Sequence, residues 1–277
     1  MWPWFLTTAH AASAVDTEQP CGPVLAVSVE LVCGSLRVRG ADRATVRVTG
    51  TVDDPEALHV SSTPGQVSIA VDSRRNHDCA DLIVETPIAA SLHAEVVSAN
   101  LAVEGLAGRL DLESTSGAIA IGGNPAGIDA SSISGSVTVT GRTPAAEVAT
   151  VSGAIRLSGV SGRVEAESVS GSIDVSAGGP LESLDAETMS GAIAVLGALP
   201  HNGAWSLESH TGELRVTIPA DTSAVVTWST FSGGVDTALS PAGTGNAPKD
   251  GSTTLGAGDA RIELETFTGA IRVNRGG

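Results

Sequence analysis

The chain has 277 residues and a formal net charge of −16, with 33 glycines, 42% hydrophobic residues and only 3% aromatic residues. The negative charge argues against nucleic acid and anionic lipid as partners, because both require a positive surface that displaces counterions. Solubility is the ordinary explanation for such a charge.

Residues 1–14 resemble the end of a secretory signal peptide, because the small-x-small pattern of Ala12-Ser13-Ala14 precedes a polar run that begins at Val15. The stretch lacks a basic beginning and its apolar core is short, which a start codon placed too late would explain. We therefore expect a truncated signal peptide over residues 1–14, an N-terminal extension over residues 15–23, and export of the protein. No other segment approaches the ~18 apolar residues that a membrane span needs, so we expect no transmembrane segment in the mature chain.

Three cysteines, Cys21, Cys33 and Cys79, lie in the N-terminal third of the chain. They form no CxxC pair and no pattern with zinc-ligand spacing. In an exported protein, one disulfide and one remaining thiol is the simplest account, and Cys33 with Cys79 is the preferred pair among three. Three separate thiols are the alternative, which the sequence leaves open.

The stretch from residue 24 to 103 predicts short strands, because apolar and polar residues alternate and glycines punctuate the alternation. The expected strands cover residues 24–29, 35–39, 44–49, 66–71, 81–85, 91–97 and 100–103.

From Leu110 to Val195 a short phrase built on Ser-Gly occurs five times, with glycines spaced by 18, 18, 18 and 20 residues. A fixed period in this range indicates a solenoid, in which each repeat stacks on the next. We therefore expect an all-β fold without significant helix: a single-stranded parallel β-solenoid, or β-helix, with rungs of ~18 residues. The single solenoid domain is expected to cover residues 24–277.

Each repeat contains two short strands with apolar residues at alternate positions, and the Ser-Gly pair lies at the corner between them. Glycine is expected there because it enters left-handed backbone conformations without penalty, and the preceding serine or threonine is expected to bond the turn backbone. The predicted corner glycines are Gly117, Gly135, Gly153, Gly171, Gly191, Gly212, Gly233 and Gly269.

Beyond residue 195 the pattern loosens, and residues 239–260 form a Gly/Pro/Ser/Thr-rich stretch that predicts a long exposed loop. The aromatic residues gather in this part of the chain. We expect Trp205, Trp228, Phe231 and Phe267 to widen and close the C-terminal end of the core, as atypical terminal repeats do.

Acidic residues occupy two columns of the repeats, six and four positions before the corner glycine, and strand parity points both columns outward. The candidate acidic interaction face consists of Asp111, Glu113, Asp129, Glu147, Glu165, Glu167, Asp185 and Glu187, and Glu208, Glu263 and Glu265 continue the columns. One hypothesis is that this face binds a divalent cation or a basic partner, because calcium prefers carboxylate oxygens. The alternative is a solvated polar face with screened charges. The Gly-Gly-x-Gly-x-Asp calcium repeat is absent, so we assign no metal ligand and no cofactor, and calcium is the one cation to test.

Catalytic motifs are not found in this sequence. There is no Gly-x-Ser-x-Gly elbow, phosphate loop or metalloprotease motif, and the histidines are scattered. His210 occupies the corner column that Ile133 and Val151 fill in the regular repeats, which favours a tolerated substitution over a catalytic base. We assign no catalytic residue and expect a protein that is not an enzyme.

Three features carry a resemblance to a known family: the run from Asp81 to Pro87, the link from Glu104 to Leu110, and the serial Val-Ser-Gly-x-Ile units. They resemble the "putative adhesin" β-repeat family of bacterial envelope proteins, the Toastrack domain, over roughly Val24 to Val273. The resemblance implies a parallel β-solenoid in the periplasm or at the surface of a bacterium. Its role would be that of an adhesin-like or stress-linked interaction module that binds an envelope protein or surface polymer and has no catalytic residues.

This chain departs from that family in two respects. Relatives often carry Asp after the corner glycine, where this chain has Ala118, Ser136, Ala154, Ser172, Ala192 and Glu213. Many relatives in envelope-stress pathways are fused to membrane segments, which this sequence lacks. An attachment to such a pathway is therefore unsupported.

A polysaccharide-binding or polysaccharide-processing β-helix is the rival interpretation, because paired carboxylates on an acidic face could serve as acid and base. Against it, glycan sites usually present exposed aromatic side chains, and this chain places its few aromatics at mainly inward columns. A carboxylate repeated in most rungs also suggests a structural pattern, since a catalytic pair need occur only once.

Overall fold

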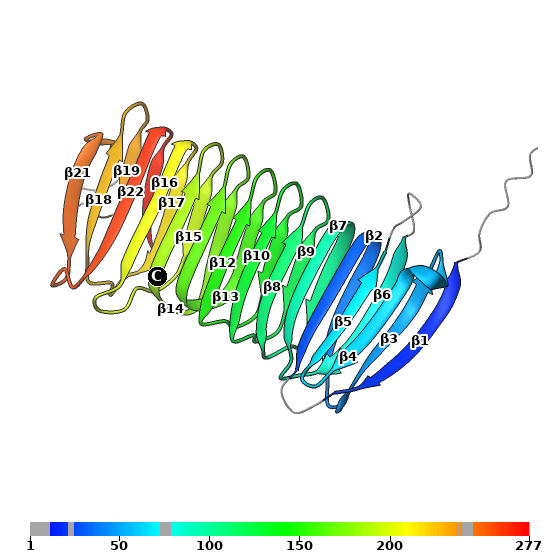
Figure 1. Cartoon of the computed structure of the whole chain (residues 1–277). Coiled ribbons are helices and arrows are strands. Elements are labelled where there is room, and N and C mark those ends of the chain that lie inside the picture. The colour runs from blue at the N-terminus through cyan, green and yellow to red at the C-terminus, as the bar shows by residue number, and fades with distance from the viewer. Residues whose placement is uncertain (1–11, 22–24, 73–78, 238, 240–245, 277) are drawn as a thin grey trace, which may run out of the picture.

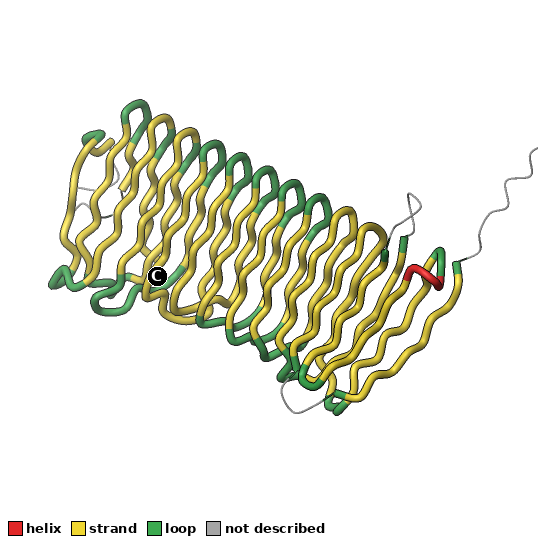
Figure 2. The backbone as a smooth tube through the Cα atoms, viewed as in Figure 1, coloured by secondary structure: helices red, strands yellow, loops and turns green. Residues whose placement is uncertain are grey.

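The computed structural model describes residues 12–21, 25–72, 79–237, 239 and 246–276. Over these residues the chain is all-β, and its one helical element is the three-residue turn η1 (Pro55–Ala57), which is too short to cross a bilayer. The strands lie across the axis of an elongated molecule and are joined by loops along its two edges (Figures 1 and 2).

The N-terminal end combines parallel and antiparallel pairing. The strands here are β1 (Ser13–Pro20), β2 (Ala26–Ala41), β3 (Thr45–Val52), β4 (Leu58–Thr63), β5 (Gln66–Val71), β6 (Ala80–Pro87) and β7 (Ser91–Glu104). The long strand β2 pairs in parallel with β5 and β6 on one edge and with β7 on the other. The antiparallel pairs β1–β3, β3–β6 and β4–β5 close this end.

The central part is a parallel stack. It consists of β8 (Arg109–Ser114), β9 (Ile119–Gly122), β10 (Gly127–Ser132), β11 (Val137–Thr140), β12 (Ala145–Thr150), β13 (Ile155–Ser168), β14 (Ile173–Thr188) and β15 (Ile193–Leu196). In register, Ile128 stands opposite Leu110 on one side and opposite Ala146 on the other, so equivalent positions of successive repeats are neighbours. This arrangement is consistent with the expected β-solenoid.

The C-terminal end does not follow chain order. Its strands are β16 (Ala204–Thr211), β17 (Leu214–Pro219), β18 (Ala224–Thr230), β19 (Val235–Thr237), β20 (Asn246–Ala247), β21 (Asp250–Leu255), β22 (Ala260–Thr268) and β23 (Ile271–Gly276). The last repeat inserts between the two before it, because β22 pairs in parallel with β16 on one edge and with β18 on the other. Figure 1 shows the same order, with β21 at the end.

The expectation of one long loop over residues 239–260 is wrong in part. The segment contains β21, which pairs antiparallel with β18 and covers the last edge of the stack. An edge strand needs only backbone partners and one packed face, so β21 consists mainly of Gly, Ser and Thr between Asp250 and Leu255 and carries no apolar period in its sequence. Residues 240–245 lie outside the described residues.

Inward columns of aliphatic side chains form the core. Val137, Ile155, Ile173 and Ile193 follow one another on adjacent strands, and each is fully buried. Trp205 also belongs to this core, and its indole Nε1 donates a hydrogen bond to the carbonyl oxygen of Leu181 at 3.1 Å.

Two of the four aromatic residues assigned to the closing of the core are placed differently. Trp228 is buried, as expected, but Phe231 and Phe267 are 69% and 50% exposed. Both occupy the position two residues before a corner glycine, which the strand alternation directs outward, because the residue before each of them is buried.

The corner glycines are required for a different reason from the expected one. None of the eight has a positive φ; left-handed backbone occurs instead at the opposite corner, for example at Gly141 with φ 138°. At the Ser-Gly corner, successive rungs approach each other closely. A Cβ on Gly153 would lie 1.9 Å from the carbonyl oxygen of Gly135, and a Cβ on Gly171 would lie 1.8 Å from that of Gly153. A side chain therefore has no room between two stacked backbones.

The hydroxyl that bonds the corner also comes from another residue than expected. The serine next to the glycine is exposed, whereas the hydroxyl residue three positions before the glycine is buried. The Gly171 N–H donates to Ser168 Oγ at 2.7 Å, and the Gly153 N–H donates to Thr150 Oγ1 at 2.9 Å. Thr188 Oγ1 donates in turn to the carbonyl oxygen of Gly171 at 3.2 Å and links two rungs.

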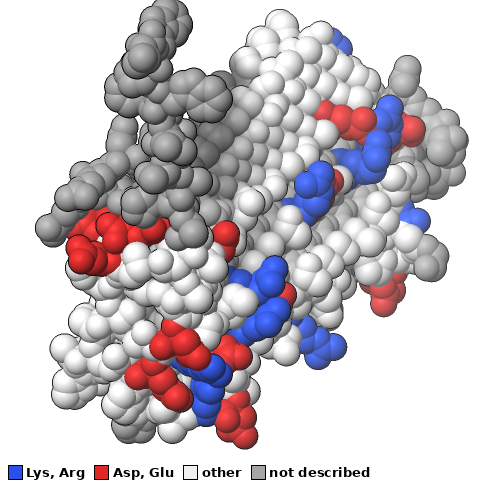
Figure 3. All heavy atoms as spheres, turned by 90° about the vertical axis from the view of Figure 1, so that its right-hand side faces the viewer, with Lys and Arg blue, Asp and Glu red and all other residues white. Residues whose placement is uncertain are grey.

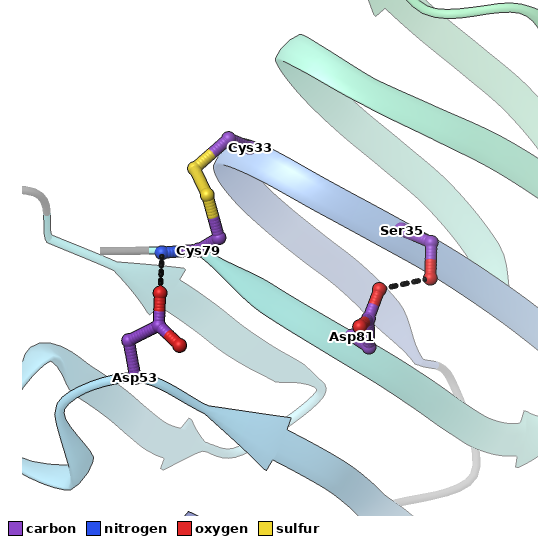
Figure 4. The surroundings of a disulfide bond; sticks show 5 residues. All are labelled: Cys33, Ser35, Asp53, Cys79 and Asp81. Carbon is purple, nitrogen blue, oxygen red and sulfur yellow. Dashed lines mark hydrogen bonds between the residues drawn. A yellow bond between two sulfur atoms is a disulfide. The ribbon is translucent and has the colours of Figure 1, made fainter. Parts of the chain in front are cut away.

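Cys33 and Cys79 form a disulfide bond, the pair preferred from the sequence, and Cys21 is a free thiol (Figure 4). The bond joins β2 to the residue just before β6, where the Cys79 N–H also donates to Asp53 Oδ2 at 3.1 Å. Next to it, Ser35 Oγ donates to Asp81 Oδ1 at 2.6 Å across the same strand pair. Burial raises the pKa of the Cys21 thiol.

The proposed signal peptide lies mostly outside the described residues, which begin at position 12. Ser13 and Ala14, at the end of that segment, are the first residues of β1 and pair with Val52 and Thr51 of β3.

Replacing Gly153 with alanine should lower the free energy of unfolding by more than about 2 kcal/mol, because the new Cβ would overlap the Gly135 carbonyl. Urea denaturation followed by circular dichroism measures the change. Ser152→Ala is the matched control, since that neighbouring side chain is exposed, and it should stay within about 0.5 kcal/mol of the unmodified chain. Equal stabilities of the two variants would contradict this account of the corner.

Replacing Cys33 and Cys79 together with serine should lower the free energy of unfolding by about 3 kcal/mol, because the crosslink closes a loop with a sequence separation of 46. Cys21→Ser controls for the loss of a thiol and should leave stability nearly unchanged. If the double variant is as stable as the Cys21→Ser protein, the disulfide bond does not contribute to the free energy of unfolding and the prediction is wrong.

Candidate functional site

A groove of about 1200 Å³ runs along the outer face of the stack and is lined by residues from the ten neighbouring strands from β5 to β22, and by His59 of β4 at its N-terminal end. Most strands contribute three consecutive residues, which stand four, three and two positions before the corner glycine or its equivalent. Positions four and two point outward and form the walls. Position three is buried and forms the floor. The repeat itself therefore builds the groove.

The first wall carries the inner of the two predicted acid columns. We call these residues the groove acids: Glu30, Glu95, Glu113, Glu167, Glu187, Glu208 and Glu265. The outer acids, Asp111, Asp129, Glu147, Glu165 and Asp185, also point outward but do not line the groove. The structure thus divides the candidate acidic face into two rows with different surroundings.

The groove acids form two clusters. In one, Glu167, Glu187, Glu208 and Glu265 stand opposite one another on successive strands. In the other, Glu95 stands between Glu30 and Glu113. Ser131 and Ala149 separate the clusters.

Repulsion within the larger cluster acts on Glu187. Desolvation, followed by the charges of Asp185, Glu208, Glu167 and Glu165, raises the pKa of the Glu187 carboxyl above its usual range.

Basic partners are scarce along this wall. Over the described part of the chain, no Lys, Arg or His forms an ion pair with Glu113, Glu167, Glu187, Glu208 or Glu265. Glu95 does have a partner, since its Oε1 lies 3.0 Å from His93 Nε2, and His93 Nδ1 lies 3.2 Å from Asp111 Oδ2. Burial lowers the pKa of His93, but these two carboxylates outweigh burial and the net pKa is raised.

At the N-terminal end, in contrast, acidic side chains are paired with arginines. Arg47 binds Asp16 through two hydrogen bonds of 2.9 and 2.7 Å, and Arg43 binds Glu85 at 2.6 Å. Figure 3, seen from the end that carries β1, shows Lys and Arg side chains lying beside Asp and Glu side chains. Acids are therefore neutralised in pairs there, whereas the larger cluster of groove acids keeps its charge.

The second wall is apolar and exposed, which the sequence did not lead us to expect. We call it the corner ladder: Val97, Ile133, Val151, Val169, Met189 and Phe267, with exposures between 45% and 57%. At its C-terminal end the rings of His210, Phe267 and Phe231 are stacked, with centroids 4.9 Å apart at each step. Contiguous exposed apolar side chains on a soluble protein commonly mark an interaction site. The sequence did contain a signal for this wall. Apolar residues recur two positions before the corner glycine, and burial in the core does not explain them, because the position points outward.

The floor consists of hydroxyl side chains whose bonding capacity is used inside the corner. Ser114, Ser132, Thr150 and Ser168 each accept a hydrogen bond from the glycine N–H three residues later. Over the described residues no histidine forms a hydrogen bond with these four hydroxyls, which hold the turn instead.

One Ser, Asp and His cluster lies outside the groove but lacks a catalytic arrangement. Ser223 Oγ donates to Asp259 Oδ2 at 2.9 Å, and His201 Nδ1 lies 3.2 Å from the same carboxylate oxygen. Ser223 Oγ also accepts from the backbone N–H groups of Ala257 and Gly258, so it caps a turn. Among the residues with described positions, no group of three or more His, Cys, Asp or Glu side chains could hold a metal ion.

Comparison with known proteins connects this architecture to a family. The family model described as Toastrack DUF4097 matches residues 30–274. A solved structure described as a "putative adhesin" from Parabacteroides merdae has a TM-score of 0.54 and 9% identity, with 94% of this chain and 95% of that chain covered. Another "putative adhesin", from Bacteroides fragilis, has a TM-score of 0.52 and 11% identity, with 95% and 98% covered. At these identities the likeness shows the fold alone. No curated protein sequence matches the chain.

Replacing Glu187 with glutamine should raise the free energy of unfolding at pH 7 by about 0.5 kcal/mol, because it removes like charges on adjacent strands. The raised pKa of Glu187 means that the folded chain holds a proton at a pH where the unfolded chain has lost it, so stability falls as pH rises through this window. The gain should therefore be present at pH 7 and disappear below the usual pKa of glutamate.

Urea denaturation at pH 7 and at about pH 3.5, below the usual glutamate pKa, measures the difference. Glu182→Gln is the matched control, since this exposed glutamate lies outside the groove. A gain that is equal at both pH values, or equal in the two variants, would contradict the proposed repulsion.

Proposed function

Because the chain belongs to the Toastrack DUF4097 family, we propose that it is a non-enzymatic, adhesin-like module of the bacterial cell envelope that recognises its partner through the groove. The observation that carries the proposal is the groove itself, with exposed aliphatic side chains on one wall and, on the other, glutamates of which all but Glu95 have no ion-pair partner among the described residues. The structural relatives described as "putative adhesin" support the same general role. In this proposal the protein is exported, and the solenoid has rungs of ~18 residues that present one copy of each wall residue per rung.

The groove suits recognition better than catalysis. Its acids repeat from strand to strand without a distinct pair, and its floor hydroxyls are occupied by backbone donors. A row of equivalent positions binds a long, repetitive or extended partner, because each rung adds one more contact of the same kind.

Binding of an envelope polysaccharide is the second candidate, and one specific observation favours it. The stacked rings of His210, Phe267 and Phe231 form an exposed aromatic cluster, and His210 and Phe267 line the groove together with Glu265. This observation removes the earlier objection that the chain lacks exposed aromatic side chains.

A photo-activated crosslinking residue placed at Val151 or at Val169 should capture an envelope component in the native cell, because both side chains project from the corner ladder. The same residue at Ala145, which is exposed but outside the groove, is the control and should not capture that component. Mass spectrometry and digestion with proteases or glycosidases then identify the captured class. Identical products from all three positions, or none from the groove positions, would refute a role for the groove.

A further inference from the structure

We propose that the groove binds an extended polypeptide segment of roughly a dozen residues, in which Lys or Arg side chains alternate with aliphatic side chains. This inference rests on the proposed function and specifies the chemistry of its partner. Four features of the groove lead to it: dimensions, charge, apolar wall and saturated backbone.

The dimensions favour an extended chain. Ten strands separated by about 4.8 Å make a groove about 43 Å long, so a volume of about 1200 Å³ corresponds to a mean cross-section of about 28 Å². Adding the radius of a water molecule on each side gives a channel about 9 Å wide, which is narrower than the 10–12 Å of an α-helix with its side chains. An extended peptide advances about 3.3 Å per residue and would need about 13 residues to cover the length.

The charge favours a cationic segment. Six of the seven groove acids have no ion-pair partner among the described residues, and four of them are adjacent across strands. Lys or Arg side chains of a ligand would relieve the repulsion that, together with desolvation, raises the pKa of Glu187. A second copy of this chain would bring its own acid row and a net charge of −16 against the first, so self-association is disfavoured.

The apolar wall favours a polypeptide over other cationic polymers. Val97, Ile133, Val151, Val169 and Met189 offer aliphatic contacts, which match Val, Ile or Leu side chains of a peptide. At the C-terminal end, the stacked Phe267 and His210 rings lie in the same groove as Glu208 and Glu265, so apolar ring edges and carboxylates are offered to a ligand side by side.

The backbone of the strands under the groove is not available for hydrogen bonds to a ligand. The strands under the groove have neighbours on both sides, so their N–H and C=O groups are used within the sheet. Recognition is therefore carried by side chains, and both walls must contribute.

Fluorescence anisotropy with the full chain tests the proposal. The probe is a labelled 12-residue peptide in which Lys and Val alternate. The comparison peptides carry Glu in place of Lys, or Ser in place of Val, and a hexamer of N-acetylglucosamine serves as the glycan. We expect the Lys-Val peptide to bind, with an affinity that falls as salt increases, and the other three ligands to bind at least about tenfold more weakly.

Two pairs of matched variants locate the binding. Glu167→Gln, Glu187→Gln and Glu208→Gln combined should weaken binding of the Lys-Val peptide about tenfold. Glu147→Gln, Glu165→Gln and Asp185→Asn combined remove the same number of charges from the outer acids and should weaken binding no more than about threefold, because these side chains do not line the groove and act on the ligand only at longer range. Val151→Ser with Val169→Ser should weaken binding severalfold, whereas Leu196→Ser, an exposed aliphatic residue outside the groove, should not.

All substituted side chains are exposed, so thermal melting should show each variant folded. Equal losses from the inner and outer acid variants would overturn the inference, since binding would then be unspecific attraction. Equal binding of the Lys-Ser peptide would also overturn it. If only the glycan binds, or if no peptide binds while crosslinking still captures a component from Val151 and Val169, this inference fails and the proposed function stands.

Discussion

The close stacking of backbone on backbone at the Ser-Gly corner is the constraint on which the rest of the structure depends. Each corner glycine lies directly against the carbonyl oxygen of an equivalent corner in the neighbouring rung, as Gly171 does against Gly153. Because no side chain fits there, successive rungs can superimpose without offset, and their strands remain in register. The buried hydroxyl three residues earlier then satisfies the glycine N–H, which would otherwise be left without a partner beneath the groove.

That register is also what creates the groove. When rungs superimpose, residues at the same position of the repeat become neighbours, so one glutamate per rung becomes a row and one valine per rung becomes a ladder. The floor between them is low because its side chains turn inward to the corner. In an isolated hairpin, an outward-facing residue would have no row of equivalent residues beside it. Repeated over many rungs, two such columns enclose a continuous surface with two chemistries.

The distribution of charge gives this surface its character. At the N-terminal end, arginines pair with nearby carboxylates, as Arg47 does with Asp16. Along the groove the larger acid cluster has no such partners among the described residues, although Arg156 and Arg215 lie on the neighbouring face of the stack and pair there with Asp174 and Glu213. The protein thus maintains like-charge repulsion along one row while it neutralises charge elsewhere. A binding surface for cations would have this property, whereas a purely structural face would gain stability from interspersed lysines.

The sequence by itself determined the all-β architecture, the position of the corners, the inward columns and the outward direction of Glu113, Glu167 and Glu187, because these follow from periodicity along one chain. The tertiary structure decided which segments lie next to one another, because the periodicity of the sequence does not specify such contacts. The need for glycine comes from a carbonyl in another rung, and the insertion of β22 between β16 and β18 reverses the chain order. Phe231 and Phe267 stack outside the core because that insertion places their corners side by side. Such contacts depend on which segments become neighbours in space, and the order of residues within one repeat does not determine this.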